Sequence, residues 1–243
     1  MTAVSAQSAL QYLLFRIYRR AVPESLRRGR FGEFVETHAP HDFVYNPEYF
    51  RDVIENHSGE AAGPIAESIM RDLAPRSVLD VGCGGGNLLE ALQKRGCEVF
   101  GLEFAAAGVE ACKRRGVPVR RFDLRRETFE AKRRYDLVCS IEVAEHLPEH
   151  AADGYVRLLA EAGKALVFSA ATPGQGGTDH LNEQPHAYWV EKLAAHGLLH
   201  EDAISASWRD EWERAGLQPW FWRNVMVFRR AGSGRIVNRD ATE

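Results

Sequence analysis

The amino-acid sequence predicts an α/β fold: a doubly wound, mostly parallel seven-stranded sheet with an N-terminal helical extension. Between residues 61 and 231, apolar runs of strand length alternate with segments of helical periodicity, which is typical of a parallel sheet with helices on both faces. The first of these strands ends in a carboxylate and a run of glycines. With 243 residues, 45% of them hydrophobic, the chain is long enough for one such domain and an extension.

The elements follow in chain order. Residues 5–20 have helical spacing, with apolar side chains on one face and arginines beyond it, so they predict a basic amphipathic arm. The predicted helices cover residues 62–73, 86–95, 105–115, 151–162, 185–195 and 209–216. The predicted strands cover residues 77–81, 97–102, 117–121, 135–140, 164–169, 200–207 and 220–228. We expect the polar tail, residues 232–243, to be disordered.

Composition narrows the possible functions. The formal charge of -3 argues against a dedicated nucleic-acid binder, which usually has a basic balance. The cysteines form no C-x-x-C pair, so they suggest neither a zinc site nor a disulfide framework, and we expect reduced thiols in a cytoplasmic protein. The apolar run from Tyr12 to Phe15 is too short for a signal sequence or a membrane span.

The most informative segment is residues 78–89, VLDVGCGGGNLL, where a strand, a tight turn and a helix start follow one another. Such a turn lets main chain approach a ligand closely. The dinucleotide pattern G-x-G-x-x-G fails, because Asn87 and Leu89 stand where glycine is required. Asp80 would repel a pyrophosphate but would accept hydrogen bonds from an ammonium group. With Glu103 placed for ribose hydroxyls, the pattern favours S-adenosylmethionine, a nucleoside cofactor without phosphate.

These residues resemble the glycine-rich first motif of class I S-adenosylmethionine-dependent methyltransferases. The resemblance continues at Glu103, at residues 122–124 and at residues 135–147, and covers roughly residues 60 to 230. It implies a Rossmann-like methyltransferase fold whose last two strands form an antiparallel hairpin. The cofactor-binding residues that it implies are Asp80, Gly82, Cys83, Gly84, Glu103, Phe104, Asp123, Leu124, Ile141 and Glu142.

Periodicity, composition and the resemblance together predict three parts of the chain. Residues 1–60 are the helical arm and a segment that covers cofactor or substrate, residues 61–231 are the methyltransferase domain, and residues 232–243 are the tail. The arm is expected to pack on the domain or on a second subunit, which would make a homodimer. Binding to a membrane surface or to an anionic partner is the alternative.

Residues 142–146, EVAEH, follow the fourth strand and combine two carboxylates with an imidazole. Methyl transfer by direct displacement requires in-line alignment, and a base helps where the acceptor carries a proton. His146 is the first choice for this base, because an imidazole ordinarily has a pKa of about 6.5. Glu145 and His180 are further catalytic candidates.

The same pentad resembles a motif of two methyltransferase groups that use a divalent metal. These are the quinone-biosynthesis O-methyltransferases and the enzymes that methylate the 3′ end of small RNAs. A metal site, if present, would use Glu142, Glu145, His146 and His180, with Asp179 as a further ligand. The alternative is that Glu142 only binds cofactor or caps a helix.

A second source of acceptor contacts is the glycine-rich loop from residue 172 to 189, which leaves the fifth strand and should lie over the methyl donor. Its candidate hydrogen-bonding groups are His180, Asn182, Gln184 and Tyr188. For Trp189 we favour packing in the core of a helix over stacking on an acceptor ring.

The sequence thus predicts a methyltransferase that acts on oxygen in a small hydroxylated acceptor, such as a sugar unit or a natural product. Three alternatives stay open: an N-methyltransferase for a small amine, an RNA 3′-end ribose 2′-O-methyltransferase, and a non-catalytic cofactor-binding partner subunit. No Asn/Asp-Pro-Pro-Tyr follows the fourth strand, which argues against DNA amino groups as the target.

Overall fold

The computed structural model describes Ile17, Phe50 and residues 21–23, 55–131, 133–177 and 180–232. Within them, seven strands form one sheet of order β3-β2-β1-β4-β5-β7-β6. The strands are β1 (Ser77–Val81), β2 (Glu98–Glu103), β3 (Val119–Arg121), β4 (Tyr135–Ile141), β5 (Gly163–Ser169), β6 (Leu198–His200) and β7 (Met226–Arg230). Strands β1 to β5 pair in parallel, whereas β7 is antiparallel to both β5 and β6. The predicted fold class and the antiparallel end of the sheet are confirmed.

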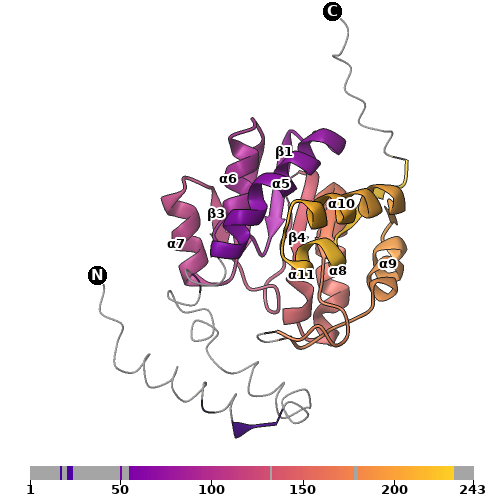
Figure 1. Ribbon diagram of the computed structural model, residues 1–243. Helices are drawn as coiled ribbons and strands as arrows, with labels where there is room; N and C mark the ends of the chain where they lie inside the picture. The colour runs from indigo at the N-terminus through magenta and orange to yellow at the C-terminus, as the bar shows by residue number, and fades with distance from the viewer. Residues whose placement is uncertain are drawn as a thin grey trace, which may run out of the picture.

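Helices cover both faces of this sheet (Figure 1). One face carries α5 (Asn56–Asp72), α6 (Asn87–Gln93), α7 (Ala106–Arg114), α10 (Asp202–Arg214) and α11 (Pro219–Asn224). The other face carries α8 (Ala152–Ala162) and α9 (His186–Ala195). Two short 3-10 turns, η3 (Ala144–His146) and η4 (Glu149–Ala151), lead from β4 to α8.

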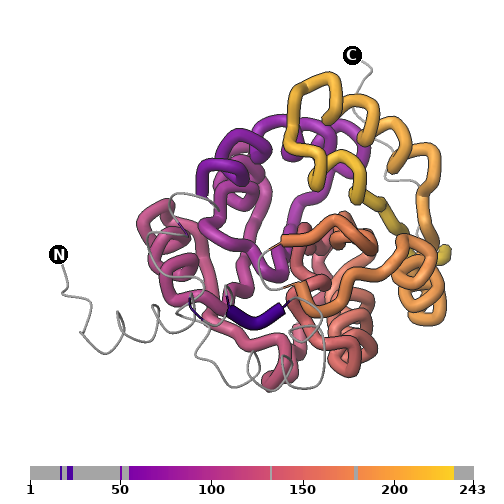
Figure 2. The backbone as a smooth tube through the Cα atoms, turned by 60° about the horizontal axis from the view of Figure 1, so that its bottom comes forward, coloured from indigo at the N-terminus to yellow at the C-terminus, as the bar shows by residue number. Residues whose placement is uncertain are grey.

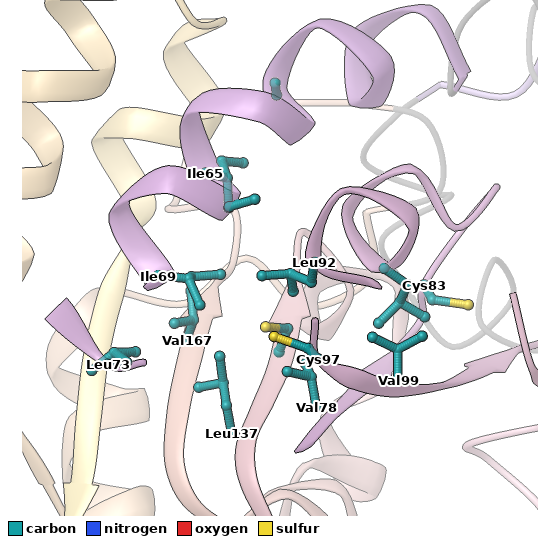
Figure 3. Packing of buried hydrophobic residues seen from close by; sticks show 14 of the residues in the cluster. Ile65, Ile69, Leu73, Val78, Cys83, Leu92, Cys97, Val99, Leu137 and Val167 are labelled. Carbon is teal, nitrogen blue, oxygen red and sulfur yellow. The ribbon is translucent and has the colours of Figure 1, made fainter. Parts of the chain in front are cut away.

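The central strands separate two hydrophobic cores. Val78 packs with α5 and α6, whereas Leu79 packs with α8 and α9, as expected where successive strand residues point to opposite faces. Figure 3 shows the first core, in which Ile69 of α5 and Leu92 of α6 point onto strand residues such as Val167. Because β1 is buried on both faces, its sequence, Ser-Val-Leu-Asp-Val, has apolar residues on both sides and a single carboxylate.

The C-terminal part departs from the sequence prediction. Residues 200–207, predicted as a strand, belong mostly to α10, and the predicted short helix at 209–216 is the second half of the same helix. Trp208 and Trp212 are four residues apart, so a helix brings both to one side, where they lie buried with ring centroids 5.5 Å apart. Their burial against α5 outweighs the short polar and apolar alternation that suggested a strand.

The predicted strand at 220–228 is wrong in its first half. Pro219 occupies the first turn of α11, and β7 begins only at Met226. Proline has no N–H group for a sheet ladder, and its fixed φ suits a helix start. As a result the chain after α10 returns towards α5, as Figure 2 shows for the yellow and purple segments.

The other predicted elements agree to within a few residues, except that α5 begins at Asn56 instead of residue 62. The domain bounds stay predictions, because most of the N-terminal arm and residues 233–243 lie outside the described residues. The homodimer expected through the arm stays a prediction for the same reason. In the part of the chain that the structure describes, no helix is both long and apolar enough to cross a membrane.

Candidate active site

A cavity of about 610 Å³ lies at the carboxyl ends of the parallel strands. The strand order reverses between β1 and β4, and ligands of such sheets bind at this point. Every residue that the sequence predicted for cofactor binding or catalysis lines this cavity. They are Asp80, Gly82, Cys83, Gly84, Glu103, Phe104, Asp123, Leu124, Ile141, Glu142, Glu145, His146 and His180. The structure brings them together, while their individual roles stay predictions.

The turn between β1 and α6 brings bare main chain into the cavity. Gly82 has a φ of 79°, which residues with a side chain rarely adopt. A Cβ at this position would also lie 2.5 Å from Cγ2 of Val143. Two residues on, the N–H of Gly84 donates to Oε2 of Glu103 at 2.8 Å, which ties the turn to the end of β2. Position 82 therefore requires glycine for two independent reasons.

Two buried carboxylates lie next to this turn. Asp80 is 5% exposed and Glu103 is 9% exposed. Burial, together with the nearby charge of Glu103, raises the pKa of Asp80 to about 8. Burial raises the pKa of Glu103 to about 7, although the N–H groups of Ala105 and Gly84 donate to it. Buried acids of this kind fit a ligand with positive charge, which would compensate their ionisation.

The end of the cavity beyond β3 combines apolar and charged groups. The N–H and Nε of Arg125 both donate to Oδ1 of Asp123 at 3.0 Å. The same guanidinium lies 5.0 Å from the centroid of the Phe104 ring, which follows Glu103. These residues and Leu124 all line the cavity, and the contact with adenine stays a prediction.

Glu142 is held firmly at the end of β4. Its φ of 53° lies in the left-handed region, and its N–H donates to Oγ of Ser169 at 3.0 Å. Its Oε1 accepts from Nδ2 of Asn224, and its Oε2 accepts from Nε2 of Gln175, each at 3.1 Å. The two amides are also joined, since Nδ2 of Asn224 donates to Oε1 of Gln175 at 2.8 Å. Burial raises the pKa of Glu142, and the amide donors work in the opposite direction.

Glu145, His146 and His180 offer ligand atoms that all lie within 4.8 Å of one another. Glu145 is fully buried, and among the described residues its carboxylate oxygens make no well-formed hydrogen bond, although the Glu142 carboxyl and the main chain of Ala171 lie close enough to affect its pKa. Burial and the neighbouring Glu142 raise the pKa of Glu145 well above its usual value. An orphaned carboxylate beside two imidazoles fits a divalent cation, which would compensate the buried charge. Glu142 is not part of this group of three, and Asp179 lies outside the described residues.

The other polar candidates of the loop are not brought to the site. Of the four residues proposed from the loop, His180 is the one that lines the cavity. Asn182 is buried and accepts a hydrogen bond from Nε2 of Gln184 at 2.9 Å. Tyr188 lies on α9 with its ring edge-on to that of Trp189. Trp189 is fully buried in the core, as expected.

The structure adds an aromatic wall that sequence reasoning missed. Trp220 and Phe221 of α11 line the cavity, and the ring of Trp220 meets that of His57 edge-on, with centroids 5.3 Å apart. The signal for this wall is the stretch 219–222, Pro-Trp-Phe-Trp, in which a proline precedes three aromatic residues. Proline at the start of such a stretch is typical of a helix start, and the strand prediction overlooked it.

Comparison with known proteins places the chain in a family. Residues 9–220 match a family model described as a methyltransferase domain. The chain belongs to this family. A ubiquinone biosynthesis O-methyltransferase from Methylobacterium sp. (strain 4-46) is 36% identical over 141 residues, which are 53% of this chain and 52% of that protein. The chain spans about half the length of the curated relatives that it matches.

Solved methyltransferase structures share the fold. A sugar N-methyltransferase from Streptoalloteichus sp. has a TM-score of 0.55 and 20% identity, over 75% of this chain and 91% of that one. The 1,6-didemethyltoxoflavin-N1-methyltransferase from Burkholderia thailandensis, with bound S-adenosylhomocysteine, has a TM-score of 0.54 and 19% identity, over 82% and 88% of the two chains. The protein is thus a methyltransferase domain of the S-adenosylmethionine-dependent class, and its acidic, glycine-walled cavity fits this cofactor.

Proposed function

We propose that the protein transfers a methyl group from S-adenosylmethionine to a hydroxyl oxygen of a small acceptor, such as a sugar unit or a natural-product metabolite. The observation that carries the proposal is that two imidazoles, His146 and His180, line the same cavity as Asp80 and Glu103. The carboxylates suit a cationic donor, and the imidazoles suit an acceptor that must lose a proton. The similarity to O-methyltransferases supports transfer to oxygen.

Bound S-adenosylmethionine supplies an electrophilic methyl group on a positively charged sulfur. The chain would provide carboxylates and main-chain groups to hold this cofactor. In this assignment Asp80, Gly82, Cys83 and Gly84 contact the methionine moiety, Glu103 and Phe104 the ribose side, Asp123 and Leu124 the adenine, and Ile141 and Glu142 the sulfonium end. The glycine turn and the hydrogen-bonded Glu142 would hold the methionine end of the cofactor, and such positioning serves the in-line geometry that displacement requires.

The acceptor is proposed to lie between the aromatic wall and the histidines. Trp220 and Phe221 supply flat apolar surface, and His146 supplies a nitrogen that accepts the proton of the reacting hydroxyl. An acceptor that has a ring or sugar face could pack on the aromatic residues and place a hydroxyl group next to the histidines. The Glu142 carboxylate is held in place by its amide partners, Asn224 and Gln175.

A divalent cation such as Mg²⁺ is a second proposed component, and Glu145, His146 and His180 would hold it. Bound there, it would lower the pKa of an acceptor hydroxyl. His146 would then serve as a ligand, so the metal and the general-base roles compete for its imidazole. The orphaned carboxylate of Glu145 is the observation that favours this component.

Calorimetric titration with S-adenosylmethionine tests the donor half of the proposal. The parent protein should bind it, and Glu103→Ala should weaken binding about 10- to 100-fold, the loss expected for a hydrogen bond to a charged group. Glu110→Ala, which removes an exposed carboxylate on α7, is the matched control and should bind like the parent. Absence of binding to the parent, or equal affinity in Glu103→Ala, would contradict the assignment.

The acceptor half is tested with panels of sugars, phenolic metabolites, amines and small RNAs, using mass spectrometry to locate the new methyl group. His146→Ala should lose turnover while it binds cofactor normally. Methylated nitrogen would favour the amine alternative. Strongly salt-dependent RNA methylation would favour the ribose alternative. Cofactor binding with no turnover on any acceptor would favour the partner-subunit alternative.

A further inference from the structure

Glu183 is a half-buried residue in the segment between β5 and α9, and the predicted chemistry gives it no role. Its side chain is 5% exposed. Its Oε2 accepts from the N–H of Gly174 at 2.9 Å, and its Oε1 accepts from the N–H of Gly176 at 2.8 Å. Its Oε1 also lies 2.9 Å from Nδ1 of His180, a residue that lines the cavity. One carboxylate therefore joins the glycine loop to a candidate catalytic imidazole.

These contacts decide which nitrogen of His180 carries the proton. Both oxygens of Glu183 already face N–H donors of the main chain, so the carboxylate acts as an acceptor. A neutral imidazole has one donor nitrogen and one acceptor nitrogen. Because Nδ1 faces the carboxylate, Nδ1 must be the donor. Nε2 is then the nitrogen whose lone pair is available for another partner.

Gly177 also restricts the position of the His180 ring, because the ring packs directly against it. A Cβ built on Gly177 would lie 2.2 Å from Nε2 and 2.5 Å from Cε1 of His180. The imidazole thus occupies the space that any side chain at residue 177 would need. The main chain is fixed as well, because the N–H groups of Leu181 and Asn182 donate to the carbonyl oxygen of Glu145 at 2.7 and 3.1 Å.

We propose that Glu183 and Gly177 are positioning residues for His180. Glu183 holds the imidazole in the Nδ1–H tautomer, and Gly177 leaves the room in which the ring lies beside His146, with ring centroids 5.2 Å apart. His180 therefore presents Nε2 as a pre-oriented acceptor, either for a proton or for a cation. A carboxylate behind the distal nitrogen is a common way to orient a functional histidine. The catalytic use of His180 rests on the proposed function, but its tautomer does not.

Nuclear magnetic resonance of the ¹⁵N-labelled protein tests the tautomer without cofactor, metal or acceptor. Long-range ¹H–¹⁵N spectra are recorded at a pH above the usual imidazole range, and His180→Gln identifies the signals of His180. The parent should show the Nδ1–H pattern. Glu183→Ala should shift His180 towards Nε2–H, whereas Glu183→Gln should keep most of the Nδ1–H form, because its amide oxygen still accepts.

Glu191→Ala, which removes an exposed carboxylate of α9, is the matched control and should leave the His180 signals unchanged. An Nε2–H pattern in the parent, or an unchanged pattern in Glu183→Ala, would overturn the inference. Should Glu183→Ala fail to fold, the parent spectrum and Gly177→Ala still decide. The added Cβ should move the His180 signals and leave those of His200, which lies on β6, in place.

A double-mutant cycle then separates positioning from general support of the loop. If Glu183 acts through His180, Glu183→Ala should lower kcat in the parent background and have less than a twofold effect in the His180→Gln background. Equal losses in both backgrounds would show that Glu183 only maintains the loop. The cofactor titration described above is independent of these spectra. Its failure would remove the proposed function and leave the tautomer as measured.

Discussion

At the scale of single residues, several groups of the cavity have unusual pKa values or an unusual backbone conformation. Asp80, Glu103 and Glu145 are carboxylates that burial makes reluctant to ionise. Glu142 adopts a left-handed backbone conformation that costs about 1 kcal/mol or more for a residue with a side chain. The fold tolerates such costs where a ligand or a neighbouring amide compensates them, and all four groups line one cavity.

The raised pKa values predict how stability depends on pH. The pKa of Asp80 is about 8 and that of Glu103 about 7, both above their ordinary values, so the folded protein binds protons more tightly than the unfolded chain. Their contribution to stability is complete below about pH 4 and is lost as the pH rises through 7 and 8. Thermal unfolding without cofactor should therefore show a decreasing Tm from pH 5.5 (about one unit above the ordinary values) to about pH 9.

S-adenosylmethionine should reverse part of this loss, because its positive charge favours the ionised acids. The increase in Tm that it causes should grow with pH, and S-adenosylhomocysteine, which lacks the sulfonium charge, should give a smaller gain. Asp80→Asn with Glu103→Gln is the control, in which the slope with pH should flatten. A slope that is the same in this double variant would show that other groups cause it.

The two hydrogen bonds that Asn224 donates, to Glu142 and to Gln175, lead to a second prediction. Asn224→Ala removes the amide that donates to Glu142 and to Gln175, and both of these hydrogen bonds are partly buried. We expect a loss of about 1–3 kcal/mol in the free energy of unfolding and weaker binding of S-adenosylmethionine. Chemical denaturation and calorimetry measure the two effects. Gln93→Ala, at the exposed end of α6, should change neither, and unchanged cofactor affinity in Asn224→Ala would mean that these hydrogen bonds are not needed for binding.

At the scale of elements, α10 and α11 distinguish this structure from what its sequence predicts. The sequence was sufficient for the parallel half of the sheet, because most strands there are short apolar runs, and β1 and β2 carry Asp80 and Glu103 at or next to their carboxyl ends. It failed after residue 200, where a few alternating residues resembled a strand. The helix is selected by tertiary contacts of Trp208 and Trp212 with α5, and local alternation does not contain that information.

The same limit applies to the site. The positions of its residues could be predicted, since the carboxyl ends of parallel strands converge. Their partners could not, since Asn224 is 82 residues from Glu142 and reaches it only through the placement of α11. The link between Glu183 and His180 is short in sequence, but it depends on a loop path that no helix or strand pattern encodes.

Trp212 tests whether α10 is held by the packing described. The side chain is 1% exposed, and its Nε1 donates to Oγ of Ser68 in α5 at 3.0 Å. Trp212→Ala should lower the free energy of unfolding by about 3–5 kcal/mol, since it leaves a large cavity and removes the hydrogen bond to Ser68. Leu199→Ala, at a position that is 52% exposed, should change it by less than about 0.5 kcal/mol in the same denaturation experiment. Equal effects would contradict the packing.

At the scale of the whole molecule, the cavity joins parts that are distant along the chain. Its floor comes from β1 and β2, one wall from α5 and α11, and another from the loops after β4 and β5. The candidate metal group spans two of these parts, because Glu145 and His146 follow β4 and His180 follows β5. A bound cation would therefore connect segments whose mutual placement forms the acceptor pocket.

This arrangement predicts the effect of metal removal. Added Mg²⁺ or Mn²⁺ should raise the Tm of chelator-treated protein, because a ligand that binds only the folded state stabilises it by mass action. Glu145→Gln should abolish this increase, and Glu149→Gln, on the neighbouring turn, should not. Activity that survives exhaustive chelation, with no change in Tm on adding either ion, would leave His146 as a base without metal.

The edge strands of the sheet affect how readily the folded protein aggregates. Its two border strands, β3 and β6, are three residues long, and β3 is Val-Arg-Arg. A foreign β-segment that adds to either border would find few open main-chain groups, and at one border it would also meet two guanidinium groups. Aggregation by strand addition is therefore disfavoured at both edges of the sheet. The folded protein should stay dispersed at high concentration for this reason.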